Sequence, residues 1–209
     1  EKGAGEFSIV TAGKGVSTQD LERIGGVVEE VAELGMEPCA SLGVLDEEQL
    51  AGLKARGLEV FHHNLETARS HYQEIVSTRS YDDNVKTVEA VKAAGLKVCC
   101  GGLFGMGESW AQRIELFAEL VRLEVDRVPI NFLIPIEGTR LAEQPLLPAM
   151  EALRIIALAR LMLPTREINV AGGENGYLDS CRLMSSWPVQ TLFWWVTISP
   201  PTAAWWRTM

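Results

Sequence analysis

The sequence has few basic residues for its size and no long apolar segment. Its 19 lysines and arginines are outnumbered by 28 aspartates and glutamates, so the formal net charge is -9 at pH 7. Nucleic acids and anionic membranes carry phosphate groups that such a surface would repel, and we expect neither as a partner. No apolar run reaches the roughly 18 residues of a membrane helix, and no secretory signal is recognisable. The sequence predicts a cytoplasmic protein that acts on small molecules and keeps its thiols reduced.

Compact metal-binding motifs are also missing. The cysteines are Cys39, Cys99, Cys100 and Cys181, and none of them forms a Cys-x-x-Cys pair. This spacing excludes a zinc-finger arrangement but still allows Cys39 and Cys99 to converge in a folded barrel, where soft thiolates favour an iron-sulfur cluster. Two buried structural cysteines are the alternative interpretation. The histidine pair at residues 62–63 lacks the spaced partner ligands that a zinc site requires.

Short apolar runs alternate with amphipathic stretches over the first 170 residues, which predicts successive βα units and a parallel sheet. Periodicity alone allows either a doubly wound sheet or a (β/α) barrel. Polar residues at the ends of the predicted strands (Cys39, His63-Asn64, Cys99-Cys100 and Asn131) favour the barrel, whose chemistry lies at that end. We expect strands at residues 7–10, 38–42, 58–61, 96–100, 127–133 and 168–170, and helices from Ser17 and at residues 46–56, 81–94, 110–123 and 150–163.

The segment from about Gly176 onward differs from everything before it. It holds five of the six tryptophans and shows neither a helical nor a strand period. Read from the third base of each codon, Phe193-Trp194-Trp195-Val196 must encode Leu-Val-Gly, an ordinary globular sequence. We therefore predict a partial barrel at residues 1–175 and a frameshifted, non-native tail at residues 176–209. A genuine tryptophan-rich tail is the alternative.

Two stretches carry polar groups or glycines typical of a binding site. Asn64 offers both a donor and an acceptor to a urea-like or amide ligand, and Glu66 could accept hydrogen bonds from the paired hydroxyls of a ribose. The glycine-rich stretch from Gly101 to Glu108 lies between a strand and a helix, where backbone amides can approach a ligand. Such turns are also glycine-rich for purely steric reasons.

Eight motifs in one order and spacing resemble the biotin synthase family over residues 6–174. They are Glu37-Pro-Cys-Ala-Ser-Leu-Gly43, His63-Asn-Leu-Glu-Thr67, Thr78-Arg-Ser-Tyr81, Lys97-Val-Cys-Cys-Gly-Gly102, Gly105-Met-Gly-Glu108, Val128-Pro-Ile-Asn131, Ile136-Glu-Gly-Thr139 and Ala157-Leu-Ala-Arg160.

The resemblance implies an α/β fold, a (β/α)8 TIM-type barrel of the radical S-adenosylmethionine (SAM) kind, here without its first strands. In this family a [4Fe-4S] cluster cleaves SAM to a 5′-deoxyadenosyl radical, which abstracts hydrogen from dethiobiotin. An auxiliary iron-sulfur cluster, [2Fe-2S] or a variant of it, then supplies the sulfur of biotin. A flavodoxin or ferredoxin as reductant and a homodimer are also expected from the resemblance.

The resemblance also implies roles for individual residues. Asn64 and Asn131 match positions that contact dethiobiotin, and Cys39 and Cys99 match two ligands of the auxiliary cluster. Positions matching cofactor-binding residues for SAM are Glu66, Gly101, Leu103, Gly105 and Glu108.

Four departures from the family pattern stand beside these matches. The Cys-x-x-x-Cys-x-x-Cys motif of the SAM-cleaving cluster does not occur in the sequence, so we expect the chain alone to be inactive. Ser8 stands where a third auxiliary-cluster cysteine is expected, and the stretch from Ala171 to Glu174 lacks the expected arginine ligand. Asn84 stands where an arginine for SAM is common.

Two other interpretations remain open from the sequence. One is a related radical SAM enzyme of the hydrogenase maturase or methylornithine synthase type. The other is a noncatalytic gene remnant. The pairing of Asn64 with Asn131 favours biotin synthase over the first, because both amides suit the ureido group of dethiobiotin.

Overall fold

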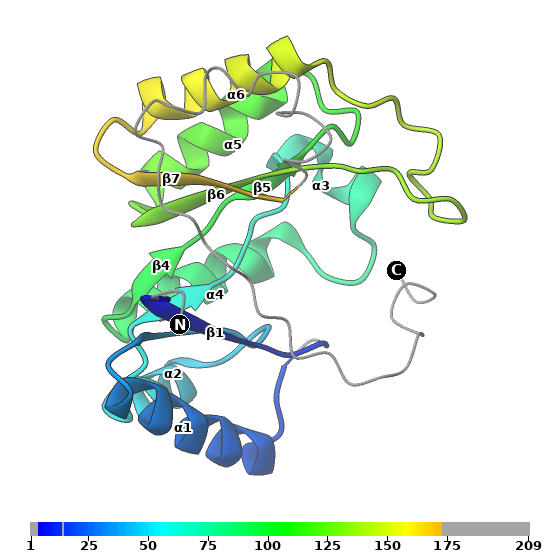
Figure 1. The fold of residues 1–209 in the computed structure, drawn as a ribbon. Helices are drawn as coiled ribbons and strands as arrows, with labels where there is room; N and C mark the ends of the chain where they lie inside the picture. The colour runs from blue at the N-terminus through cyan, green and yellow to red at the C-terminus, as the bar shows by residue number, and fades with distance from the viewer. Residues whose placement is uncertain (1–3, 14, 173–209) are drawn as a thin grey trace.

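A computed structural model describes residues 4–13 and 15–172, which form one seven-stranded parallel sheet with helices packed against it (Figure 1). The strands follow one another along the sheet in nearly sequential order, β1-β2-β3-β4-β6, with β5 and β7 both paired to β6. β4 and β5 lie in succession beside β6, separated only by residues 100 and 101. The strands are β1 (Glu6–Val10), β2 (Glu37–Ser41), β3 (Val60–His62), β4 (Lys97–Cys99), β5 (Gly102–Phe104), β6 (Arg127–Phe132) and β7 (Glu167–Gly172).

Most helices begin at side chains that cap them. Ser17 accepts a hydrogen bond from the amide of Asp20, and Asp46, Ser80 and Ser109 each form a capping box with the third helical residue. The helices are α1 (Thr18–Glu33), α2 (Glu47–Ala55), α3 (Arg69–Ile75), α4 (Tyr81–Ala93), α5 (Trp110–Arg122) and α6 (Ala149–Met162).

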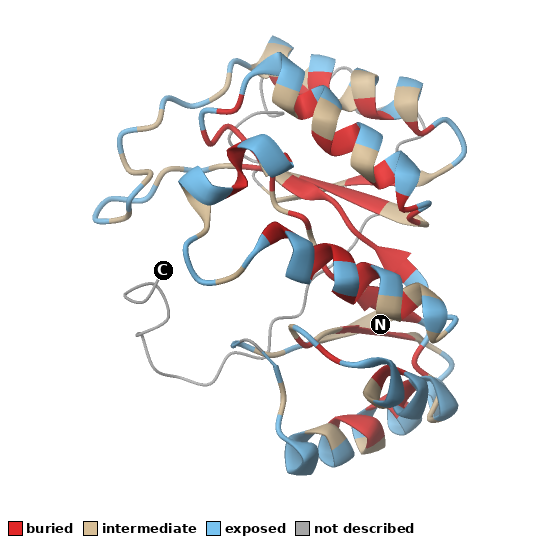
Figure 2. Cartoon of the chain, turned by 180° about the vertical axis from the view of Figure 1, so that it is seen from behind, coloured by how far each residue is buried: buried red, intermediate tan, exposed pale blue. Residues whose placement is uncertain are grey.

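The main core lies between the sheet and these helices. Alternate strand residues such as Ala40, Phe61, Val98 and Ile130 are buried there against the apolar faces of the helices. Figure 2 shows buried residues along the strands and the inner helix faces, and exposed residues on the outer helix faces. The strand residues between these core positions therefore point to the opposite, concave face of the sheet.

An ion pair demonstrates how strongly the sheet is curved. The guanidinium of Arg127 on β6 binds the carboxylate of Glu6 on β1 at 2.8 Å, although β4, β3 and β2 separate the two strands. Four strand spacings in a flat sheet would hold them roughly 19 Å apart. The parallel α/β architecture is thus confirmed, and its curvature agrees with an incomplete TIM-type barrel.

The elements differ from the predicted ones in two places. α3 was not predicted, and its first turn has no capping side chain: Ala68 precedes it. β5 was predicted as part of a glycine-rich turn, but its three residues pair with β6. The predicted tail at residues 176–209 lies outside the described residues.

Candidate functional site

The two asparagines predicted to bind substrate converge on one backbone turn between β4 and β5. Asn64 accepts a hydrogen bond from the amide of Gly101 through Oδ1 at 3.0 Å. Asn131 donates from Nδ2 to the carbonyl of Gly102 at 3.3 Å. Within the described chain, Nδ2 of Asn64 and Oδ1 of Asn131 have no further partner. The arrangement therefore offers one amide donor and one amide acceptor at neighbouring positions on the concave face.

Close packing explains why this turn consists of glycines. A Cβ atom on Gly101 would lie 1.9 Å from the carbonyl oxygen of Pro129 on β6, and one on Gly102 would lie 2.7 Å from the carbonyl oxygen of Glu66. No side chain fits at either position. These two glycines have a steric reason to be there, whatever they do for a ligand.

Glu66 follows β3 with an unusual backbone conformation. Its φ is 68°, in the left-handed region, and its carbonyl accepts a hydrogen bond from the amide of Leu103 at 2.7 Å. Burial raises the pKa of its carboxyl group, and the charge of Arg79 opposes that shift. The strained backbone places Glu66 beside the Gly101–Gly102 turn, near both asparagines.

The carboxylate of Glu108 forms hydrogen bonds with its own loop and with Arg113. It accepts hydrogen bonds from the amides of Gly105 and Met106 at 2.9 and 2.8 Å, and from Nε of Arg113 at 2.9 Å. Arg113 also binds Glu151 on α6 at 2.5 Å, and the side chains of Glu108 and Arg113 are almost fully buried. Glu108 thus shapes the loop from Gly105, and contact with a cofactor would come from the loop it holds.

The two cysteines predicted as cluster ligands share the concave face. Cys39 and Cys99 pack with Val60 in a small buried cluster that is separate from the main core. Cys100 points the other way, into that core. Burial, followed by the carboxylates of Glu6 and Glu37, raises the pKa of the Cys39 thiol to about 12. Burial also raises the pKa of Cys99 well above its ordinary value, so both thiols are protonated in the absence of a cation.

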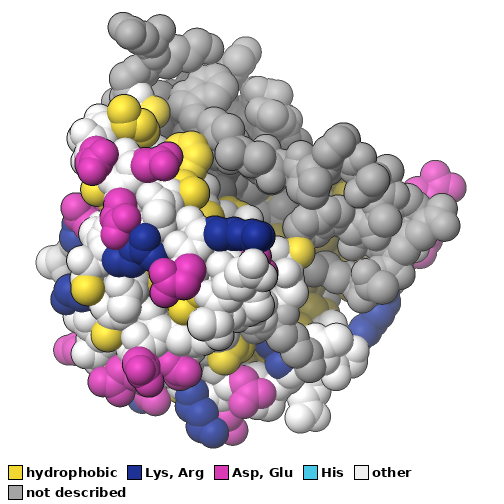
Figure 3. Space-filling view, turned by 90° about the horizontal axis from the view of Figure 1, so that it is seen from below, with side chains coloured by type: hydrophobic (Ala, Val, Ile, Leu, Met, Phe, Trp, Pro, Cys, Tyr) yellow, Lys and Arg dark blue, Asp and Glu magenta, His cyan; other side chains and the backbone are white. Residues whose placement is uncertain are grey.

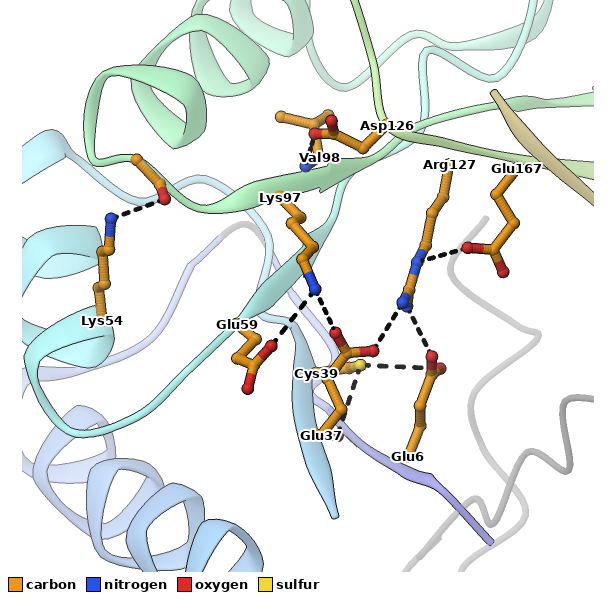
Figure 4. A network of polar contacts seen from close by, with 11 residues as sticks. Glu6, Glu37, Cys39, Lys54, Glu59, Lys97, Val98, Asp126, Arg127 and Glu167 are labelled. Atoms are coloured by element: carbon orange, nitrogen blue, oxygen red, sulfur yellow. Dashed lines mark hydrogen bonds and ion pairs between the residues drawn. The ribbon is translucent and has the colours of Figure 1, made fainter. Parts of the chain in front are cut away.

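Charged residues stand at the start of most strands and meet on the concave face beside Cys39. We name Glu6, Glu37, Lys97, Arg127 and Glu167 the strand-start network; Figure 4 shows how they lie together. Arg127 binds Glu6, Glu37 and Glu167 at 2.8, 2.6 and 3.0 Å, and Lys97 binds Glu37 at 2.7 Å. Sequence reasoning missed this network. The feature of the sequence that could have revealed it is the charged residue with which β1, β2, β4, β6 and β7 each begin.

The pKa values of Glu6 and Glu37, two acidic residues of this network, are shifted in opposite directions. Burial and the hydrogen bond with Glu37 raise the pKa of Glu6 to about 7. Burial would raise the pKa of Glu37 as well, but hydrogen bonds with Glu6, Lys97 and Arg127 outweigh it and lower the pKa to about 2. One ligand atom each from Glu6, Glu37 and Cys39 lies within 4.8 Å of the others. The concave face at Cys39 thus combines a thiol with hard oxygen donors.

The histidine pair divides between the two faces of the sheet. His62 is the register partner of Cys99, so it shares the concave face. His63 lies on the helical side, where Nε2 is 3.2 Å from Oδ1 of Asn84, and Asn84 donates to the hydroxyl of Tyr72 at 3.0 Å. Asn84 is completely buried, so it is a core residue on the helical side of the sheet.

Ser8 tests whether the cysteine site fits an auxiliary cluster. It is the register partner of Cys39, and its Oγ is buried without a hydrogen-bond partner in the described part of the chain. An orphaned buried hydroxyl is costly unless something else binds it. Cys39, Cys99 and Ser8 therefore fit a shared inorganic group, although serine is a harder ligand than cysteine.

The fold and the site define the class of protein. Residues 10–130 match the radical SAM superfamily, and residues 129–194 match the biotin and thiamin synthesis associated domain. Because the first match covers more than half of the chain, the protein belongs to the radical SAM superfamily.

Within this superfamily the chain is similar to biotin synthases. It is 47% identical over 186 residues to the biotin synthase of Citrifermentans bemidjiense, a match that covers 88% of the chain and 56% of the relative. It is 51% identical over 176 residues to that of Syntrophotalea carbinolica, covering 83% of the chain and 54% of the relative. The chain therefore spans about half the length of these curated relatives.

Solved structures agree on the fold. Methylornithine synthase superposes with a TM-score of 0.68 at 27% identity, covering 82% of this chain and 53% of the other. The FeFe-hydrogenase maturase from Carboxydothermus hydrogenoformans superposes with a TM-score of 0.69 at 18% identity, covering 84% and 44%. The higher identity to biotin synthases favours that relationship over the hydrogenase maturase or methylornithine synthase type suggested as an alternative by the sequence.

On the face seen in Figure 3, basic side chains stand among acidic ones without a continuous basic patch. Among the residues that the structure describes, no helix combines the length and apolarity needed to cross a bilayer.

Proposed function

We propose that this chain forms the substrate-binding and auxiliary-cluster part of a biotin synthase, which inserts sulfur into dethiobiotin by radical SAM chemistry. The observation that carries the proposal is the joint position of Asn64 and Asn131 on the Gly101–Gly102 turn, in a chain 47% identical to a biotin synthase. A ureido group has donor N–H groups on both sides of one carbonyl. It can donate to Oδ1 of Asn131 and accept from Nδ2 of Asn64.

The neighbouring groups support the same assignment. Glu66 is held beside this turn by its backbone bond to Leu103, where its carboxyl group can bind the hydroxyls of a ribose. The loop from Gly105 to Glu108, held by Arg113, would contact the rest of the SAM molecule. Both ligands would then be held on the concave face, shielded from bulk water by the sheet and its helices.

The cysteine pair would hold the auxiliary cluster, which in this family supplies sulfur to the substrate. Cys39 and Cys99 would each bind it through Sγ, and Ser8 would provide a weaker oxygen ligand. Both thiols must lose their protons to bind iron, which makes loading pH-dependent. The reductant, a flavodoxin or ferredoxin, and a homodimeric assembly are part of the proposal for the whole protein.

The cluster that cleaves SAM needs ligands that these 209 residues do not contain, since the four cysteines form no Cys-x-x-x-Cys-x-x-Cys motif. We therefore propose that the chain by itself binds ligands but forms no biotin. Activity is proposed for a protein that joins these residues to the remaining half found in the relatives.

Calorimetric titration with dethiobiotin tests the substrate assignment. We expect the full chain to bind dethiobiotin, and we expect Asn131→Ala to weaken that binding at least about tenfold, because a buried polar group of the ligand is left unpaired. Gln73→Ala, an exposed change on α3, is the matched control and should bind normally. Equal affinity for dethiobiotin in Asn131→Ala and the unchanged chain would contradict the proposal.

A further inference from the structure

One arginine connects strands from opposite sides of the concave face. Arg127 begins β6, and its three guanidinium nitrogens bind carboxylates on β1, β2 and β7 (Figure 4). Its side chain is 12% exposed, so these bonds are only weakly screened by solvent. The bond to Glu6 is the long-range one, because β1 and β6 are four places apart in the sheet.

Both cysteines of the concave face are attached directly to this arrangement. Cys99 on β4 is the register partner of Arg127 on β6. Cys39 lies two residues after Glu37 on β2, and its Sγ is 4.0 Å from a carboxylate oxygen of Glu6. Arg127 therefore links the strand beside Cys99 to the two acidic residues that flank Cys39.

One other described cation, Lys97, also bridges strands of the concave face. Lys97 on β4 binds Glu37 on β2 and Glu59 just before β3, but its side chain is 51% exposed, so solvent screens these bonds more strongly. Among the described residues it forms no ion pair with β1. The curvature that brings Cys39 toward Cys99 thus depends on Arg127 more than on Lys97.

We propose that Arg127 is a positioning residue for the cysteine pair: by binding Glu6 and Glu37 across the concave face, it holds Cys39 and Cys99 close enough to ligate one metal centre. The inference rests on the proposed function, in which that pair binds metal. Desolvation offsets much of the attraction within such a buried ion pair, so its role in this inference is to specify geometry. Removing Arg127 leaves three carboxylates without their cation and should lower the stability of the fold as well, so the test counts the thiolates that bind metal in folded protein.

Cobalt(II) titration of the reduced full chain tests this inference. The sulfur-to-cobalt charge-transfer absorbance reports how many thiolates bind the metal, and Cys181→Ser provides a background without the fourth cysteine. We expect two thiolates in this background. In Arg127→Gln we expect one thiolate and an affinity lower by roughly tenfold or more, as for other residues that orient metal ligands. Arg127→Lys keeps the positive charge and should restore part of the thiolate binding and part of the affinity for cobalt.

Control variants separate the possible outcomes. Arg122→Gln removes a surface ion pair with Glu119 and should leave the cobalt spectrum unchanged. Glu6→Gln removes the ion pair between Arg127 and β1 but leaves an amide oxygen that can still accept from Cys39, and it should reproduce the loss if Arg127→Gln does not fold. If Arg127→Gln folds and still binds cobalt through two thiolates with unchanged affinity, the positioning role of Arg127 is wrong, although the proposed metal site still stands. If Arg127→Gln does not fold, the same result in Glu6→Gln leads to the same conclusion. A cobalt spectrum insensitive to Cys39→Ser and Cys99→Ser would overturn the proposed metal site as well.

Discussion

The tight approach of β4 to β6 at Gly101 leads to a quantitative prediction. In Gly101→Ala the new methyl group would lie 1.9 Å from the carbonyl oxygen of Pro129 and 2.9 Å from its carbonyl carbon. Both are main-chain atoms, so the two strands must separate by about 1 Å, a shift typical of overpacked sites that cost about 1–3 kcal/mol. The adjacent bond from the Cys100 amide to the Arg127 carbonyl, 2.9 Å long, would weaken and add about 1 kcal/mol.

We therefore expect Gly101→Ala to lower the free energy of unfolding by about 2–4 kcal/mol, which for a chain of this length lowers the melting temperature by roughly 10 °C. Circular dichroism recorded during thermal unfolding measures this change in melting temperature. Gly52→Ala is the matched control: this exposed α2 glycine has no heavy atom within 4 Å of its would-be Cβ. Its free energy of unfolding should rise by about 0.5–1 kcal/mol, because alanine has a higher helix propensity than glycine. A melting temperature of Gly101→Ala within about 1 °C of the unchanged chain would refute the reasoning.

Three further predictions concern other parts of the molecule. Burial lowers the pKa of His63 to about 4 from 6.5, so the unfolded chain binds more protons at this residue between these two pH values. Because His62 and Glu6 also titrate in this range, the His63 contribution is measured by urea unfolding as the difference in stability between the unchanged chain and His63→Asn, and it should fall by about 3 kcal/mol from pH 6.5 to 4. Cys39 and Cys99, each at most 3% exposed, should resist Ellman's reagent at pH 8 until urea unfolds the chain; fast labelling of either would contradict their burial. Glu108→Gln should cost about 1–3 kcal/mol and increase proteolysis after residue 104, because Arg113 loses one of its two carboxylate partners; unchanged cleavage would show that Glu108 does not hold the loop.

Local signals in the sequence were sufficient for most of the fold. The cap Ser17 and the alternation of apolar runs located five of the six described helices and the parallel sheet, and the structure adds Asp46, Ser80 and Ser109 as caps. These features depend on hydrogen bonds and periodicity within a few residues of one another. α3 escaped prediction because it has only seven residues and no side chain caps it, and β5 because it has only three residues and lies in a glycine-rich stretch.

The motifs also identified the superfamily, because their order and spacing are properties of the sequence alone. They named Asn64, Asn131, Cys39 and Cys99 as candidates, but not how these residues are arranged. That Asn64 and Asn131 bind the same backbone turn follows from contacts between segments tens of residues apart. The partners of Glu108 in its own loop and in Arg113 are near in sequence, but only the folded loop turns their donors toward the carboxylate.

Only the tertiary structure brought the strand-start network together. Arg127 meets Glu6 across 121 positions of sequence because parallel pairing sets the register and the twist of the sheet curves β1 toward β6. Neither register nor curvature is encoded by any single strand; both arise from how all the strands pack against their helices. The sequence determined which residues could do chemistry, and the curvature of the sheet determined which of them meet.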